Sequence, residues 1–346
     1  MSRRTVFQIL LTAMGMVLIL VFSGVVSAQG NSEQAFERVK EVQERHTDRL
    51  MAMAGVEGTA VGYDANGQVA VHVYTEGPGV AGIPRTLDGV PVHVEVTGKF
   101  YAQPKGAKPG KKPTPADRID PTGWFERPVP IGVSTGNEGE CSAGTIGCRV
   151  TDGTNVYALS NNHVYALENK AATGSEVLQP GLYDTGCVYN SDNVIGRLTR
   201  FEEIVFSTTA RNTVDAAIAL CSEGTLGNAT PSNGYGTPGT TPTAASVGMA
   251  VQKYGRTTGL TKGTVTATNA TVNVGYSSGT ARFVGQIVIT GDRGKFSNAG
   301  DSGSLIVTND DACNPVGLLF AGSVRQTIAN PIDAVLDALD VEIDGK

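Results

Sequence analysis

The sequence predicts an all-β protein, built from short strands and turns, with a short C-terminal helix and a small α+β unit in front. Glycine is abundant, at 44 of 346 residues, and charged residues make up only 17%. This composition is typical of sheet proteins with many turns. From Arg127 onward, short runs rich in Val, Ile and Thr alternate with turn-forming residues. The net charge of −6, without a dense basic patch, argues against nucleic acid as a partner.

The N-terminus predicts an export signal. Arg3 and Arg4 precede a mostly apolar stretch over 9–26, and the small residues Val26-Ser27-Ala28 follow where a signal peptidase would cut. We therefore expect residues 1–28 to be a signal peptide and the protein to be secreted, periplasmic or at the cell surface. The alternative is an uncleaved membrane anchor, because 9–28 is long enough to span a bilayer. Membrane contact is expected only in that case.

Residues 31–101 predict a small α+β unit. Apolar residues recur at helical spacing over 31–55, where Gly55 is a suitable stop. Strands are expected at 59–63, 68–74 and 90–96, the first two joined by the hairpin turn Asp64-Ala65-Asn66-Gly67. His72 and His93 lie on two of these strands, so a shared metal site is conceivable. Two solvent-facing histidines are the preferred interpretation, and no metal or cofactor is expected.

Residues 102–126 predict a linker, because 104–113 is poor in apolar residues and rich in Pro, Gly and Lys. Beyond it, 227–243 is a second stretch rich in Gly, Pro and Thr. Asn330-Pro331 predicts a helix start, followed by Ile332, Val335, Leu336 and Leu339 on one face. The expected strands of this region are 130–135 paired with 145–151 as a hairpin, 156–160, 193–199, 205–207, 247–253, 263–271, 286–290, 304–308 and 316–322.

The segment 300–304, Gly-Asp-Ser-Gly-Ser, is the first candidate for chemistry, and the apolar run 305–307 follows it. A serine hydroxyl becomes a good nucleophile only when a base removes its proton and nearby donors receive the developing charge. The flanking glycines permit a tight turn whose N–H groups converge. By itself the segment is a weak signal, because such a composition more often marks an ordinary surface turn.

A base and an acid are present elsewhere in the chain. His163 is the single histidine after Phe100, and it follows the apolar stretch 156–160. Asp215 stands at the head of an apolar run that ends at Leu220. A carboxylate entering such a run needs a hydrogen-bond partner, and an imidazole N–H is a suitable one. The chain order His, Asp, Ser is one of the orders known for a catalytic triad.

These segments together resemble the trypsin/chymotrypsin-like serine proteases, in particular the secreted bacterial branch. The segment 253–265, with Gly255-Arg256-Thr257-Thr258-Gly259, is similar to a hairpin that precedes the nucleophile in bacterial members. The resemblance covers Arg127 to the C-terminus. It implies a double β-barrel protease domain over 127–346, with the boundary at about 227–243, a closing helix, and a peptide or protein substrate.

The resemblance also implies roles for individual residues. Ser302 would be the nucleophile, His163 the general base, and Asp215 the carboxylate that orients the imidazole. The backbone N–H groups of Gly300 and Ser302 would form the oxyanion hole. Asp301 would point away from the substrate. Arg127-Pro128 is a poor cleavage site for releasing a new N-terminus near Ile131, so we expect Asp301 to have an internal partner.

Substrate selection is expected to depend on two further places. Phe296 stands where relatives place the floor of the primary specificity pocket. It offers no carboxylate to a basic residue, so an apolar or small residue before the scissile bond is expected. Phe320, Ala321 and Gly322 are expected to form the strand edge along which an extended peptide pairs.

Five cysteines, at positions 141, 148, 187, 221 and 313, fall in the protease-like region. Export permits disulfides, and the odd count leaves a thiol without a partner in the chain. Cys187–Cys221 and Cys141–Cys148 are the alternatives considered, and the sequence does not choose between them. The bridge customary in relatives is absent, because Val164 follows His163. No clustered Cys/His spacing suggests a metal site.

Two functions remain open. The first is a secreted endopeptidase in which the unit over 31–101 acts as a pro-segment, an inhibitor or a targeting module. The second is a protease-fold binding or assembly protein with a closed site. An esterase on the same scaffold is a third and weaker alternative. The natural substrate and the oligomeric state lie beyond what the sequence predicts.

Overall fold

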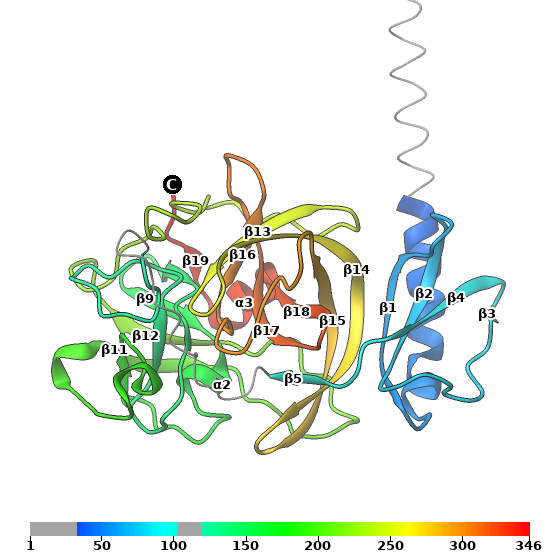
Figure 1. Ribbon diagram of the computed structural model, residues 1–346, viewed down its shortest axis with the longest axis horizontal. Coiled ribbons are helices and arrows are strands. Elements are labelled where there is room, and N and C mark those ends of the chain that lie inside the picture. The colour runs from blue at the N-terminus through cyan, green and yellow to red at the C-terminus, as the bar shows by residue number, and fades with distance from the viewer. Residues whose placement is uncertain (1–32, 103–118) are drawn as a thin grey trace, which may run out of the picture.

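The computed structural model describes residues 33–102 and 119–346. The predicted signal segment and most of the predicted linker lie outside the described residues. Two β-sheets, one of 8 and one of 11 strands, account for most of the structure (Figure 1). The predicted fold class is confirmed: the described chain is predominantly β, with a short C-terminal helix and an α+β unit at its N-terminal side. No helix of the described ranges is long and apolar enough to cross a membrane.

Two of the three predicted catalytic residues adjoin strands of the first sheet. Its strand order is β19-β8-β9-β12-β11-β10-β6-β7, and every neighbouring pair is antiparallel. Val150, Leu159, Ile195 and Ile218 are buried in its core. The strands are β6 (Ser134–Asn137), β7 (Gly144–Thr145), β8 (Cys148–Thr151), β9 (Val156–Ser160), β10 (Glu176–Leu178), β11 (Val194–Phe201), β12 (Ala217–Cys221) and β19 (Glu342–Ile343); the helical turns are α2 (Asn162–Tyr165), η1 (Leu182–Thr185) and η2 (Ser191–Asn193).

The second sheet contains a closed barrel. Its strands run in the order β13-β16-β17-β18-β15-β14, and β13 also pairs with β14, which closes the ring. Val265, Ile289, Phe296 and Leu319 belong to one of its buried clusters. The predicted apolar face of the closing helix is buried against the rest of the domain. The elements are β13 (Ala250–Gly255), β14 (Gly259–Tyr276), β15 (Gly279–Gly291), β16 (Leu305–Thr308), β17 (Pro315–Gly322), β18 (Gln326–Pro331) and α3 (Ile332–Leu339).

The N-terminal unit continues the second sheet. A helix over 33–51 packs on strands β1 (Val56–Tyr63), β2 (Val69–Thr75), β3 (Thr86–Leu87) and β4 (Val90–Val96) (Figure 1). The three predicted strands and the predicted hairpin between β1 and β2 are confirmed. β1 pairs with β14, so the unit is joined to the barrel by backbone hydrogen bonds as well as by the chain.

One short strand was not predicted. β5 (Phe100–Ala102) leaves the N-terminal unit and joins the barrel (Figure 1). It pairs in parallel with β14 and antiparallel with β17, where Ala102 lies opposite Ala321 and Tyr101 opposite Gly322. The chain's own segment therefore lies on the strand edge that we expected a peptide substrate to use.

Two strand predictions are wrong. Residues 205–207 form no strand. The side chain of Asn212 hydrogen-bonds the backbone of Val205 in place of a neighbouring strand: Nδ2 donates to the carbonyl (3.0 Å) and Oδ1 accepts from the N–H (2.9 Å). The hairpin predicted between 130–135 and 145–151 is formed only at its near end, where β6 pairs with β7 at Ser134 and Thr145 and Ile146 exchanges backbone hydrogen bonds with Gly132 and Val133. From Cys148 onward the strand pairs with β9 instead.

Both disulfide alternatives are also wrong. Cys141 bonds with Cys187, and their Cα atoms lie 5.2 Å apart. Cys141 lies in the loop after β6 and Cys187 in the loop after η1. No sequence pattern indicates that these two loops are neighbours. Cys148 is buried on β8, and Cys221 ends β12 on the other side of β9, so two strand spacings separate them. Cys148, Cys221 and Cys313 are free thiols.

Candidate active site

The three predicted catalytic side chains come from turns where the two sheets meet. His163 lies in α2, directly after β9 of the first sheet. Asp215 precedes β12 of the same sheet, and Ser302 precedes β16 of the second sheet. Each residue thus sits just outside a buried strand, which fixes its backbone while leaving its side chain at the junction.

His163 and Asp215 form a hydrogen-bonded pair. The Nδ1 atom of His163 lies 2.7 Å from Oδ2 of Asp215, and the backbone N–H of His163 donates to Oδ1 at 3.2 Å. Asp215 is fully buried. Its backbone is held by Asn330, whose Oδ1 accepts from the Asp215 N–H (3.1 Å), and by Asn161, whose Nδ2 donates to the Asp215 carbonyl (2.7 Å). Because the carboxylate accepts from Nδ1, the remaining ring nitrogen, Nε2, is available as a base.

Tyr276 is a further partner of Asp215 that sequence reasoning missed. The Tyr276 hydroxyl, at the end of β14, donates to Oδ2 of Asp215 at 2.8 Å. Burial, with the neighbouring Asp215 charge, raises the pKa of Tyr276 well above 10, so the phenol remains a donor at neutral pH. No motif marks this tyrosine in the sequence, because its partner lies on a different sheet.

Ser302 and His163 line a single cavity of about 450 Å³. Ser302 Oγ and His163 Nε2 are both buried, and neither has a hydrogen-bond partner among the described residues. The structure thus brings the serine and the imidazole to one cavity without joining them by a hydrogen bond. Unpartnered buried polar atoms are rare and call for an explanation, and catalytic hydrogen bonds are often long in the absence of substrate. The cavity is lined by Tyr101, Ala102, Glu140, Ser142, Ala143, Gly144, His163, Val164, Glu168, Gly275, Tyr276, Ser277 and Ser302.

The turn that carries Ser302 requires glycine on both sides. Gly300 has φ +93° and Gly303 has φ +91°, which L side chains rarely adopt. A Cβ at Gly303 would also lie 2.3 Å from the Thr145 carbonyl. Thr145 on β7 holds the turn, since its hydroxyl donates to the Gly300 carbonyl (2.9 Å) and its N–H to the Ser302 carbonyl (2.8 Å). The N–H groups of Gly300 and Ser302 have no partner within the described chain; Ser302 lines the cavity, whereas Gly300 is not among its lining residues.

Asp301 has an internal partner, as expected. Its Oδ2 lies 3.6 Å from Nζ of Lys253, and both side chains are fully buried. Thr257 and Thr258 donate their N–H groups to Oδ1 at 2.9 and 3.1 Å. Burial lowers the pKa of Lys253, and the Asp301 charge opposes that shift. The Gly-Arg-Thr-Thr-Gly segment therefore supports the carboxylate beside the serine.

A second buried ion pair joins the two sheets. The guanidinium of Arg256 binds both carboxylate oxygens of Asp184 in η1, with Nε 2.6 Å from Oδ2. Both side chains are almost completely buried. Arg256 thereby connects the turn after β13 to the first sheet, next to Gly300.

The predicted specificity residues lie in two different environments. Phe296 is buried in the barrel core and is not among the residues that line the cavity. Phe320 is also a core residue, and its ring packs 4.7 Å from that of Phe283. Ala321 and Gly322 present the predicted strand edge, which β5 occupies. Tyr101 and Ala102 of β5 consequently reach the cavity that holds Ser302.

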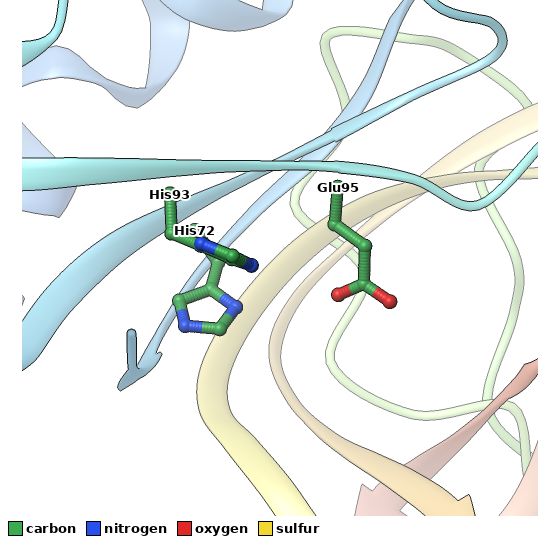
Figure 2. Close-up of side chains that lie close together, drawn as sticks. All are labelled: His72, His93 and Glu95. Atoms are coloured by element: carbon green, nitrogen blue, oxygen red, sulfur yellow. The ribbon is translucent and has the colours of Figure 1, made fainter. Parts of the chain in front are cut away.

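The interpretation of His72 as solvent-facing is wrong, since it is only 6% exposed. It faces His93 across β2 and β4, with ring centroids 4.8 Å apart, and Glu95 lies beside them (Figure 2). Burial and the neighbouring His93 lower the pKa of His72 to about 4. These three side chains are a group whose ligand atoms all lie within 4.8 Å of one another, so they could hold a metal ion.

Comparison with known proteins found similarity in sequence and in structure. A sequence family described as the Nal1 C-terminal domain matches residues 238–330, which include Ser302. No curated protein matches the chain significantly. Among solved structures, Thermobifida fusca protease A has 19% identity and a TM-score of 0.45, covering 63% of this chain and 99% of that one. A chymotrypsin of Cellulomonas bogoriensis has 23% identity and a TM-score of 0.43, covering 63% and 99%. A Nocardiopsis protease has 20% identity and a TM-score of 0.42, covering 62% and 98%.

Proposed function

We propose that this chain is a secreted serine endopeptidase that uses Ser302, His163 and Asp215. The observation that carries the proposal is that one cavity is lined by two residues with buried, unpartnered polar atoms: the Oγ of Ser302 and the Nε2 of His163. The opposite ring nitrogen of His163 is held by Asp215 at 2.7 Å. Export is proposed from the N-terminal signal pattern, and a peptide or protein is the proposed substrate.

The proposed reaction has two halves. His163 Nε2 removes the proton of Ser302 Oγ as the oxygen attacks the scissile carbonyl, and Asp215 stabilises the resulting imidazolium through Nδ1. The N–H groups of Gly300 and Ser302 stabilise the negative oxygen, a contribution of about 2.7–4 kcal/mol per donor. Nε2 then protonates the leaving amine, and an acyl-enzyme forms. Water, deprotonated by His163, hydrolyses the acyl-enzyme and regenerates Ser302.

The N-terminal unit is proposed to act as an intramolecular inhibitor. β5 pairs with Ala321 and Gly322 on β17, where an extended substrate would add as a strand. Tyr101 and Ala102 line the cavity of Ser302. A substrate must therefore displace β5, or the segment must be released by cleavage in 103–123. Mass analysis of the wild type beside Ser302→Ala distinguishes these routes, since self-cleavage in 103–123 would appear only in the wild type.

The alternative function is a binding or assembly protein whose site is permanently closed, which the position of β5 also favours. Hydrolysis separates the two functions. We expect the wild type to cleave an unstructured protein such as casein, and Ser302→Ala to leave it intact. A wild type that is well folded, retains β5 and does not hydrolyse peptides or esters under any condition would favour the alternative. Turnover of esters without peptides would favour the esterase.

A further inference from the structure

Outside the active site, three potential ligands meet on one face of the N-terminal sheet. β2 and β4 run parallel, and His72 lies opposite His93 while Tyr74 lies opposite Glu95. His93 and Glu95 are two residues apart on β4, so both side chains point to the same face. Figure 2 shows both imidazole rings turned toward the Glu95 carboxylate.

One ring nitrogen of His72 has a lone pair that no hydrogen bond uses. The Nε2 atom lies 3.1 Å from the Tyr63 carbonyl oxygen, which can only accept, so Nε2 carries the proton. Nδ1 is then the unprotonated nitrogen. It is buried and has no partner among the described residues, on a side chain that is 94% buried. A histidine that donates one N–H to a backbone carbonyl and presents its other nitrogen is arranged as metal ligands usually are.

We propose that His72 Nδ1, a ring nitrogen of His93 and the Glu95 carboxylate form a metal site that takes zinc. Two imidazoles and one carboxylate are a ligand set that Zn²⁺ favours, with a fourth position open to water. The three ligand atoms lie within 4.8 Å of one another, whereas ligands around a tetrahedral zinc ion lie about 3.4 Å apart. The proposed site therefore requires the ligands to move closer together when the ion binds, and the side chain of Glu95, which is only partly buried, is the one that we expect to change rotamer.

The surroundings of the site support a bound ion. Gln326, at the start of β18, lies beside Glu95, and its Oε1 is buried without a partner. The Tyr74 hydroxyl, next to His72 along the same strand face, is likewise buried and unpartnered. Unpartnered polar atoms thus occur on His72 and Tyr74 of β2 and on Gln326, which lies beside Glu95. A metal ion would give His72 Nδ1 the partner that it lacks and would join β2 to β4.

The test is metal binding by the full-length, tag-free protein. We expect one equivalent of Zn²⁺ in native mass spectrometry, and Co²⁺ should give the visible absorption of a tetrahedral site. His93→Asn and Glu95→Gln should each weaken binding by more than about tenfold, because each removes a ligand. Zn²⁺ should raise the Tm of the wild type and not that of these variants. His46→Asn is the matched control, since His46 lies in the same unit but pairs with Asp88.

Three results would overturn the proposal. The first is the absence of stoichiometric binding at micromolar Zn²⁺. The second is binding that survives both His93→Asn and Glu95→Gln. The third is binding that is lost in His163→Asn but kept in the two N-terminal variants, which would place the ion in the active site. The Tm of each variant is first compared with that of the wild type in the absence of metal, so that a variant that does not fold is recognised. If either His93→Asn or Glu95→Gln is unfolded, the metal binding of the other variant decides the test.

Discussion

Nζ of Lys253 lies 3.6 Å from Oδ2 of Asp301, and both groups are completely buried next to Ser302. The carboxylate beside the proposed nucleophile therefore has its cation within the chain. The pair is present in the uncleaved chain, in which Ile131 is fully buried in the first core. A new N-terminus near Ile131 is therefore not needed as the partner of Asp301. We infer that the loop carrying Ser302 is arranged before any cleavage, and that access to the cavity is limited by β5.

The first prediction concerns this pair. Lys253→Met leaves the Asp301 carboxylate buried without its cation, which should destabilise the protein by about 3–5 kcal/mol. The double variant Lys253→Met/Asp301→Asn should recover part of that loss, as a double-mutant cycle in urea would show. Activity should fall in both, because the loop loses its support. Arg149→Met, which breaks the Asp344 pair away from the cavity, should lower stability but not kcat/KM. Strict additivity of the two substitutions would contradict the coupling.

The second prediction tests Tyr276 as a positioning residue. Tyr276→Phe removes the donor to Asp215 Oδ2, and a hydrogen bond to a charged group contributes about 1.5–3 kcal/mol. If about 1.4 kcal/mol of this hydrogen-bond energy stabilises the transition state, its loss lowers kcat/KM about tenfold, mostly through kcat. Tyr157→Phe is the matched control, because it removes a Tyr–Asp hydrogen bond of 2.6 Å far from the cavity. Equal kcat/KM values in the two variants would contradict this role.

The third prediction concerns acid stability. Burial acts to raise the pKa of Glu168, but hydrogen bonds from Ser278 and Ser277 outweigh it and lower the pKa from 4.5 to about 2. Because the folded value is the lower one, the carboxylate stabilises the fold fully above pH 4.5, and this contribution is lost as the pH falls toward 2. Glu168→Gln should therefore lower the Tm at neutral pH, with the difference from wild type shrinking across that window.

The control for Glu168 is Glu203→Gln, which changes an exposed carboxylate. Its difference from the wild type should stay small at every pH. Circular dichroism melts at several pH values between neutral and strongly acidic supply both comparisons. A Glu168→Gln difference that stays constant, or grows on acidification, would contradict the assigned contribution.

The fourth prediction concerns β5. Tyr101→Pro removes the backbone N–H of a residue that pairs with Gly322, and proline does not fit a paired strand. Loss of one or two backbone hydrogen bonds, at about 1 kcal/mol each, should raise kcat/KM on a short peptide about tenfold. Tyr101→Phe keeps the strand and should behave like the wild type. A folded Tyr101→Pro protein with unchanged or lower activity would contradict the inhibitory role.

Local patterns in the sequence predicted much of the fold. The strand at 90–96 is confirmed as β4, the strand at 156–160 as β9, and the apolar face of the closing helix is buried. These elements have clear alternation, helical spacing or turn residues at their ends, so their own residues determine them. The proposed catalytic residues were found because each adjoins such a strand. His163 and Asp215, which are 52 residues apart, form their hydrogen bond because β9 and β12, the strands next to them, pair in the sheet.

The features that were not predicted depend on distant partners. β5 has only three residues, and its strand partners lie on β14 and β17, so no local pattern marks it. Tyr276 acquires its contact with Asp215 only through the length of β14. The Cys141–Cys187 bond joins two loops whose approach is set by tertiary packing. The sequence predicts an exposed His72, because alternation alone does not reveal that the N-terminal sheet continues into the barrel.

Covalent labelling by a fluorophosphonate probe, read by intact mass, tests the central proposal most directly. We predict one adduct on the wild type, faster labelling of Tyr101→Pro, and no adduct on Ser302→Ala or His163→Ala, although all four proteins are folded. Peptide mapping should place the adduct on Ser302. Absence of labelling in both the wild type and Tyr101→Pro, or an adduct that persists in Ser302→Ala, would contradict the account.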